Sequence, residues 1–281
     1  MNRQEYYLAA RDGPKLFIRH FQPEKNAKAI VVLVHGFSEH SGRYVHWAER
    51  FVRQEIEVYA MDYRGHGNTE GIRGHTPAYS YLLDDIESCI EEINNPDGKP
   101  VVIYGQSLGG NMVLNYALWR KHSLAGVIST SPWLKLVTKP KTITVLFARI
   151  LRLIAPRFIN DSKLDINMLS HDPQVVIDYE KDPLTHSFIT PQLFFGSEKA
   201  ARRAIKNAGK ITIPILLMHG TGDLVTSWRT SEKFAKKAKN TGADITFVKW
   251  TDYYHELHNE INNDAVFDKI MEWMNIKIIN K

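Results

Sequence analysis

The sequence predicts an α/β fold on a mostly parallel, eight-stranded sheet with helices on both faces, and three observations support this. Short apolar runs alternate with longer helical patterns over most of the 281 residues, as in parallel strands joined by crossover helices. Several of these runs, such as residues 29–34 and 101–104, are almost continuously apolar, which is typical of strands covered on both faces. One long interval, residues 132–210, breaks the alternation and indicates an inserted segment.

The strands and helices follow in order. Two short runs flank a turn at residues 12–14 and predict an antiparallel hairpin, with strands at 6–10 and 15–21. The other six strands are expected at 29–34, 58–61, 101–104, 126–129, 213–218 and 245–250. Helices are expected at 44–54, 79–94, 108–121, 227–239 and 261–276. Crossovers between parallel strands are right-handed, so we expect a doubly wound sheet.

The inserted interval contains no good strand. It offers helical stretches at residues 142–155, 172–181 and 191–207, separated by prolines. We therefore expect a core of residues 1–131 and 211–281, and a helical cap of residues 132–210. The cap is expected to lie over the carboxyl ends of the strands, where ligands bind in sheets of this kind.

The first cap helix carries an apolar stripe at helical spacing, made of Ile143, Leu146, Phe147, Ile150, Leu151 and Ile154. One interpretation is that this stripe packs against the core. The other is that the excess apolar surface forms the mouth of a lipid tunnel or touches a membrane, with Arg149 and Arg152 at the level of the headgroups.

The composition narrows the class of protein. Hydrophobic residues make up 43% and charged residues 24%, which is ordinary for a globular enzyme. The net charge of +5 comes from scattered Lys and Arg without interleaved aromatic residues, so no nucleic-acid partner is expected. A single cysteine, Cys89, cannot form an internal disulfide, and we find no signal peptide or transmembrane pattern. We expect a cytoplasmic location, with peripheral membrane contact through the cap as an alternative.

The most informative motif is GQSLGG at residues 105–110, which directly follows an apolar strand and opens a helical pattern. A serine between two small residues at such a strand–helix turn is the pattern of a nucleophile elbow. Gly105 and Gly109 relieve the crowding of this sharp turn, and Gly110 lets the helix approach the strand. We therefore expect Ser107 to be a nucleophile at the carboxyl edge of the sheet.

A serine nucleophile needs a base, and the base needs an orienting acid. Asp223 and His255 each follow a predicted strand, in the chain order serine, acid, histidine. We expect Ser107, Asp223 and His255 to form the catalytic triad. Asp252 is an alternative acid and His258 an alternative base, while His219 is expected to be a structural hydrogen-bonding residue.

Acyl transfer also needs donors for the developing oxyanion. The backbone N–H of Leu108, which follows the nucleophile, is one expected donor. The second is expected from the N–H of Phe37, in the His35-Gly36-Phe37 loop after the strand at 29–34. No metal and no cofactor are expected, because the sequence lacks suitable ligand spacing and a GxGxxG motif after a strand.

Five stretches together carry a family resemblance: HGFSEHSGRY (35–44), DYRGHGNTEG (62–71), GQSLGG (105–110), HGTGD (219–223) and YHELHNE (254–260). The chain resembles the monoacylglycerol lipase and lysophospholipase branch of the serine α/β-hydrolases along most of its length. The resemblance implies an α/β-hydrolase fold with a helical cap that admits a fatty-acyl chain, and it assigns the oxyanion donors to Phe37 and Leu108.

The resemblance also maps the polar end of the substrate pocket onto Glu39, Arg43 and His258. An alternative is that Glu39 and Arg43 form an ion pair that fixes the oxyanion loop. The expected activity is hydrolysis of the carboxylic ester of a monoacylglycerol or a lysophospholipid. The alternatives are a general short-chain carboxylesterase or acyl-thioesterase and, more remotely, a non-catalytic ligand-binding protein on a hydrolase scaffold.

Overall fold

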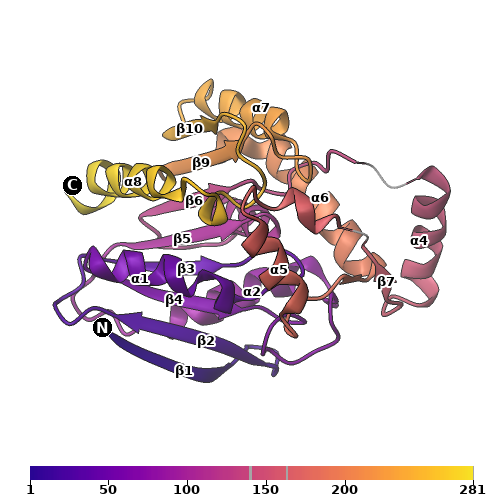
Figure 1. The fold of residues 1–281 in the computed structure, drawn as a ribbon, viewed down its shortest axis with the longest axis horizontal. Helices are drawn as coiled ribbons and strands as arrows, with labels where there is room; N and C mark the ends of the chain where they lie inside the picture. Colours follow the sequence, from indigo (N-terminus) through magenta and orange to yellow (C-terminus); the bar gives the residue numbers. More distant parts are fainter. Residues whose placement is uncertain (139–140, 163, 281) are drawn as a thin grey trace.

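An eight-stranded sheet forms the centre of the molecule in the computed structural model, which describes residues 1–138, 141–162 and 164–280 (Figure 1). The strand order is β1-β2-β4-β3-β5-β6-β9-β10; β1 and β2 pair antiparallel, as do β2 and β4, and all other neighbours are parallel. The bounds are β1 Asn2–Ala9, β2 Lys15–Gln22, β3 Ala29–Val34, β4 Ile56–Asp62, β5 Val101–Gln106, β6 Gly126–Thr130, β9 Ile215–Gly220 and β10 Ile245–Trp250. The predicted mostly parallel sheet is confirmed.

Helices cover both faces of this sheet. Helices α1 (Val45–Arg53) and α8 (Asn263–Met274) pack on one face, and α2 (Tyr79–Glu91), α3 (Leu108–Trp119) and α7 (Trp228–Lys239) on the other. The alternation of side chains along β3 explains both layers: Val31 and Leu33 belong to the first, Ile30 and Val32 to the second. Strand β3 is buried throughout, which is why its sequence is a continuous apolar run.

The segment between β6 and β9 contains α4 (Thr142–Ile154), α5 (Pro173–Lys181) and α6 (Pro191–Asn207). The prediction that it holds no strand is wrong in one detail, because β7 (Asn160–Asp161) pairs antiparallel with β8 (Phe188–Ile189). Each has only two residues, too few for a pattern to emerge. Helix α6 packs against α2 and α3, whereas α4 stands away from the sheet (Figure 1).

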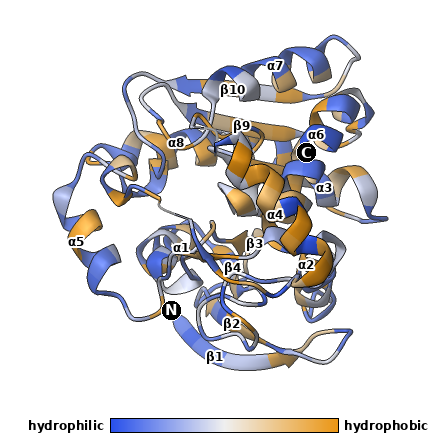
Figure 2. Cartoon of the chain, turned by 90° about the vertical axis from the view of Figure 1, so that its right-hand side faces the viewer, coloured by the Kyte–Doolittle hydropathy of each residue, from blue (hydrophilic) through white to orange (hydrophobic). Residues whose placement is uncertain are grey.

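The apolar stripe of α4 faces outward. None of the α4 residues is buried, and the exposed apolar side chains are Ile143, Leu146, Phe147, Ile150, Leu153 and Ile154. Figure 2 shows this hydrophobic helix on the outside of the molecule. The interpretation that the stripe packs against the core is therefore wrong. Among the described residues, no helix has both the length and the apolar character needed to cross a membrane.

Candidate active site

Ser107 occupies a strained turn between β5 and α3. Its φ is +53° and its ψ is −112°, a backbone conformation that non-glycine residues rarely adopt. A Cβ at Gly105 would collide with the carbonyl of Gly109, and one at Gly109 with the carbonyl of Val34. Only glycine fits at these two positions, and the turn lifts Ser107 out of the end of β5 as the sequence predicts.

Ser107, His255 and Asp223 form one continuous hydrogen-bonded chain. The Ser107 Oγ lies 2.9 Å from Nε2 of His255, and Nδ1 of the same ring lies 2.7 Å from Oδ2 of Asp223. The carboxylate accepts, so Nδ1 carries a proton and, in the neutral ring, Nε2 is left to accept from the serine hydroxyl. The three side chains come from loops after β5, β9 and β10, at the same edge of the sheet.

The surroundings keep Asp223 ionised. Burial opposes its charge, but the His255 ring and a hydrogen bond from His219 outweigh burial and lower the pKa of Asp223. Its Oδ1 accepts from the backbone N–H groups of Val225 and Thr226, and its Oδ2 accepts from the Thr226 hydroxyl. Burial likewise opposes the charged form of His255, yet the Asp223 carboxylate raises its pKa above 6.5. An imidazolium formed during proton transfer would be stabilised by this carboxylate.

The other residues considered as acid or base lie outside the hydrogen-bonded series of Ser107, His255 and Asp223. Asp252 is exposed, and its N–H bonds the Thr221 hydroxyl 2.9 Å away. The His258 ring is buried and stacks on Tyr44 with 4.2 Å between ring centres. Within the described chain neither ring nitrogen of His258 has a hydrogen-bond partner, and burial lowers the pKa of His258 well below its usual value. His219 lies behind Asp223, with Nε2 3.0 Å from its Oδ2.

The two expected oxyanion donors are free to bind. Within the part of the chain that the structure describes, the N–H groups of Phe37 and Leu108 have no hydrogen-bond acceptor. Leu108 opens α3, where the first N–H groups of a helix point outward and carry its positive dipole. Gly36 lies against the nucleophile, because a Cβ placed on it would be 3.3 Å from Cβ of Ser107.

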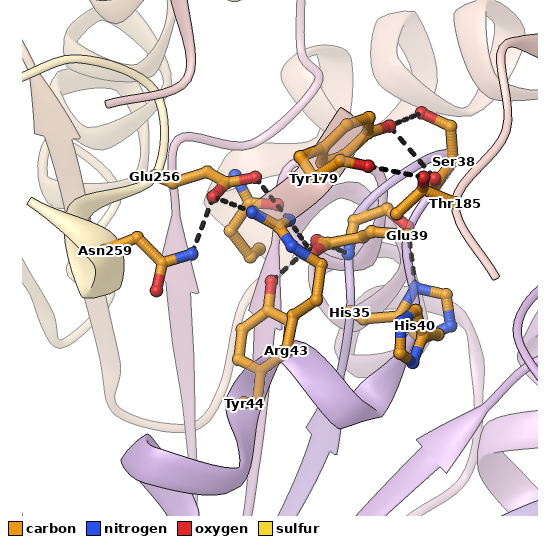
Figure 3. Close-up of polar contacts among 12 residues, drawn as sticks. His35, Ser38, Glu39, His40, Arg43, Tyr44, Tyr179, Thr185, Glu256 and Asn259 are labelled. Carbon is orange, nitrogen blue, oxygen red and sulfur yellow. Dashed lines mark hydrogen bonds and ion pairs between the residues drawn. The ribbon is translucent and has the colours of Figure 1, made fainter. Parts of the chain in front are cut away.

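Two buried carboxylates, Glu39 and Glu256, form a cluster with the largely buried Arg43 beside this site (Figure 3). Nη1 of Arg43 donates to Glu39 Oε2 at 2.6 Å, and the guanidinium makes two 2.7 Å contacts with Glu256. The Tyr179 ring of α5 covers the guanidinium at 4.8 Å. This geometry favours the ion-pair interpretation of Glu39 and Arg43, and substrate contact by Glu39, Arg43 and His258 stays a prediction.

The two carboxylates differ in how they hold protons. Burial dominates at Glu39 and, with help from the nearby Glu256 charge, raises its pKa against the pull of Arg43. Burial also opposes ionisation of Glu256, but its paired contacts with Arg43 prevail and lower its pKa. Glu256 is therefore the firmly ionised partner of the guanidinium. The sequence analysis missed Glu256, although its place directly after His255 was a usable signal.

Comparison with known proteins identifies the family. Residues 25–262 match the family described as serine aminopeptidase, S33. The chain is a member of this family, and hence a serine hydrolase. The chain is similar to a solved structure of a monoacylglycerol lipase from Paleococcus ferrophilus, with a TM-score of 0.82 and 32% sequence identity over 98% of both chains. The α/β-hydrolase fold and the family resemblance are thereby confirmed.

Two curated relatives extend the comparison. A monoacylglycerol lipase of Mycolicibacterium smegmatis is 28% identical over 277 residues, covering 97% of both proteins. An uncharacterized abhydrolase domain-containing protein of Dictyostelium discoideum is 34% identical to this chain over 274 residues, which cover 97% of the chain. The chain spans only 29% of that longer relative.

Aromatic side chains from distant segments pack around Phe37, the residue next to Gly36. The Phe37 ring packs edge-on against Trp133, His66 and His186, with ring centres about 6 Å apart. Ser107 is 6% exposed and His255 3% exposed. Both residues of the proposed proton transfer are therefore largely shielded from water.

Proposed function

We propose that this chain hydrolyses the carboxylic ester of monoacylglycerols through an acyl-enzyme on Ser107. The single observation that carries the proposal is the hydrogen-bonded chain from Ser107 through His255 to Asp223. The similarity to the monoacylglycerol lipases of Mycolicibacterium smegmatis and Paleococcus ferrophilus supports the choice of ester. The catalytic roles of the three residues are part of this proposal.

The chemistry follows from the arrangement. The Ser107 Oγ attacks the ester carbonyl carbon while its proton passes to Nε2 of His255. The carbonyl oxygen becomes an oxyanion and accepts hydrogen bonds from the N–H groups of Phe37 and Leu108. When the ester C–O bond breaks, the imidazolium returns the proton to the glycerol oxygen. Water, deprotonated by His255, then attacks the acyl carbon. The bond from this carbon to Ser107 Oγ breaks, the imidazolium returns its proton to Oγ, and the fatty acid is released.

The test measures fatty-acid release from monooleoylglycerol by the wild type, Ser107→Ala and Ser88→Ala. Ser88 is a buried serine of α2 whose hydroxyl bonds the Asp84 carbonyl, so its replacement controls for loss of a buried hydroxyl. We expect Ser107→Ala to lose hydrolysis and labelling by a fluorophosphonate, and Ser88→Ala to keep both. Equal rates for Ser107→Ala and the wild type would refute the proposal.

A substrate panel separates the expected ester from its alternatives. Monoacylglycerols, lysophosphatidylcholine, short p-nitrophenyl esters and acyl thioesters of matched chain length are compared by kcat/KM. We expect the long-chain monoacylglycerol to have the highest kcat/KM. A preference for lysophosphatidylcholine, short esters or thioesters would keep the serine chemistry and overturn the substrate.

We also propose that residues 132–210 act as a cap over a core of 1–131 and 211–281, and that α4 docks this cap on an anionic membrane. The exposed apolar stripe of α4 supports this, together with the charge around it. Between residues 134 and 160 the sequence has six Lys or Arg and no acidic residue. A groove between α4 and α6 places two of these residues, Arg149 and Arg152, together with Lys199 and Arg202. Sedimentation with lipid vesicles tests the proposal.

A further inference from the structure

The orientation of the Phe37 N–H is set through the carbonyl of Gly36. These two groups belong to one peptide unit, and the described chain contains no cis peptide bond. In a trans peptide the C=O and N–H point in opposite directions within one rigid plane. Any side chain that holds the Gly36 oxygen therefore also aims the Phe37 N–H.

Two buried rings hold that oxygen. The Tyr63 hydroxyl donates to the Gly36 carbonyl at 2.6 Å, and Nδ1 of His35 lies 2.7 Å from the same oxygen. Because a carbonyl only accepts, His35 carries its proton on Nδ1. Burial lowers the pKa of His35 to about 3, so the ring is neutral. The two rings stack with 4.2 Å between centres, which fixes one donor against the other.

Glu39 holds the other side of the same glycine. Its Oε1 accepts from the Gly36 N–H at 2.6 Å and from the Tyr44 hydroxyl at 2.7 Å. Arg43 holds Oε2 and is itself anchored by Glu256, the neighbour of His255 (Figure 3). Both peptide units that flank Gly36 are thus clamped, which fixes its φ and ψ. A Cβ at Gly36 would lie 2.6 Å from the Glu39 carboxylate, so the clamp closes only around glycine.

We infer that Tyr63 is a positioning residue of the oxyanion hole, acting with His35 and Glu39 through the two peptide units of Gly36. This inference rests on the proposed function, because it takes the Phe37 N–H as an oxyanion donor. Tyr63 lies after β4 and touches neither Ser107 nor His255 by a hydrogen bond. Its hydroxyl acts on the transition state only by aiming a backbone donor.

An aiming role has a definite kinetic signature. The oxyanion exists only in the tetrahedral transition state and intermediate. A Phe37 N–H that is tilted away from it therefore lowers kcat and leaves binding of the ground-state substrate nearly unchanged. Removing a whole oxyanion donor costs about 100- to 1,000-fold in kcat. Tyr63→Phe leaves the His35 donor in place and only loosens the peptide, so we expect a loss of about 5- to 50-fold.

The experiment compares Tyr63→Phe with Tyr59→Phe by their hydrolysis of p-nitrophenyl butyrate. This model ester can be used whichever ester is the natural substrate. Tyr59 is also buried, and its hydroxyl bonds Glu57 at 3.0 Å, so it controls for loss of a buried tyrosine hydroxyl. We expect only Tyr63→Phe to lose kcat, with KM unchanged. Its affinity for butylboronic acid, which forms a tetrahedral adduct on the serine, should fall by the same factor as kcat/KM.

Equal kcat and boronate affinity in the two variants would overturn the inference, provided that the wild type hydrolyses the ester. A wild type without Ser107-dependent hydrolysis would instead overturn the proposed function. A second pair keeps the inference testable if Tyr63→Phe does not fold. His35→Asn retains an N–H donor near the position of Nδ1 and should keep more kcat than His35→Leu; equal kcat in this pair would also overturn the inference.

Discussion

The exposed end of α4 gives a quantitative prediction about membrane binding. Leu153 is 83% exposed and Ile154 75% exposed, so both side chains can lose nearly all of their contact with water when a lipid surface covers them. We expect the double variant Leu153→Ser/Ile154→Ser to bind vesicles more weakly while folding normally, because neither side chain is part of the buried core.

The size of the effect follows from these exposed fractions. Fully burying a Leu or Ile side chain contributes about 2 kcal/mol. Scaled by the two exposed fractions, the double variant loses about 3 kcal/mol of transfer free energy, or about 150-fold in the partition coefficient. Arg149 and Arg152 add an electrostatic part of about 1 kcal/mol each, which salt screens.

The assay is co-sedimentation with phosphatidylserine-containing and pure phosphatidylcholine vesicles, at low and high salt. Ile276→Ser is the control for loss of an exposed Ile: Ile276 is 61% exposed and lies just after α8, and Figure 1 shows α8 and the C-terminus on the opposite side of the molecule from α4. Hydrolysis of a water-soluble ester should be equal in all three proteins. A partition coefficient for the double variant within twofold of the control would refute the docking of α4.

Two further predictions concern charge. Because a neutral His255 must accept the serine proton and its pKa is raised, kcat/KM for a soluble ester should fall on the acid side with a midpoint above pH 6.5; a midpoint at or below 6.5 would contradict this. Arg43→Met leaves Glu39 and Glu256 buried without their cation and should lower the free energy of unfolding by about 3–5 kcal/mol near pH 8. In this variant both folded-state pKa values rise above the unfolded ones, so the loss should shrink as the pH falls toward about 5. Urea unfolding checks this against Arg11→Met, which removes an exposed ion pair with Glu91 and should leave the free energy of unfolding nearly unchanged; a pH-independent loss in Arg43→Met would be inconsistent with the buried pair.

Local patterns were enough to predict the eight strands and the residues of the Ser107 chain. The nucleophile elbow is specified within six residues, and Asp223 and His255 each follow a strand that its own apolar run reveals. Parallel strands end at one edge of the sheet. A place directly after such a strand therefore predicts that each of the three side chains lies at that edge.

Contacts between distant segments were not predictable in the same way. Glu256 lies 213 residues from Arg43, and Tyr63 lies 27 residues from Gly36, so neither pairing leaves a periodic signal. The sequence also could not predict whether the apolar stripe of α4 packs on the core or faces outward, because an amphipathic pattern defines an apolar face but not what covers it. The short β7–β8 pair depends on register between segments 28 residues apart.

The separation of Ser107 from Asp223 and His255 has a consequence for biosynthesis. A ribosome makes the nucleophile more than a hundred residues before the acid and the base, and β9 and β10 must join the sheet before either can reach it. A nascent polypeptide that has formed only the first six strands carries a serine without its proton acceptor. On the proposed mechanism, we expect such a partial product to leave esters intact until the remaining strands have been added.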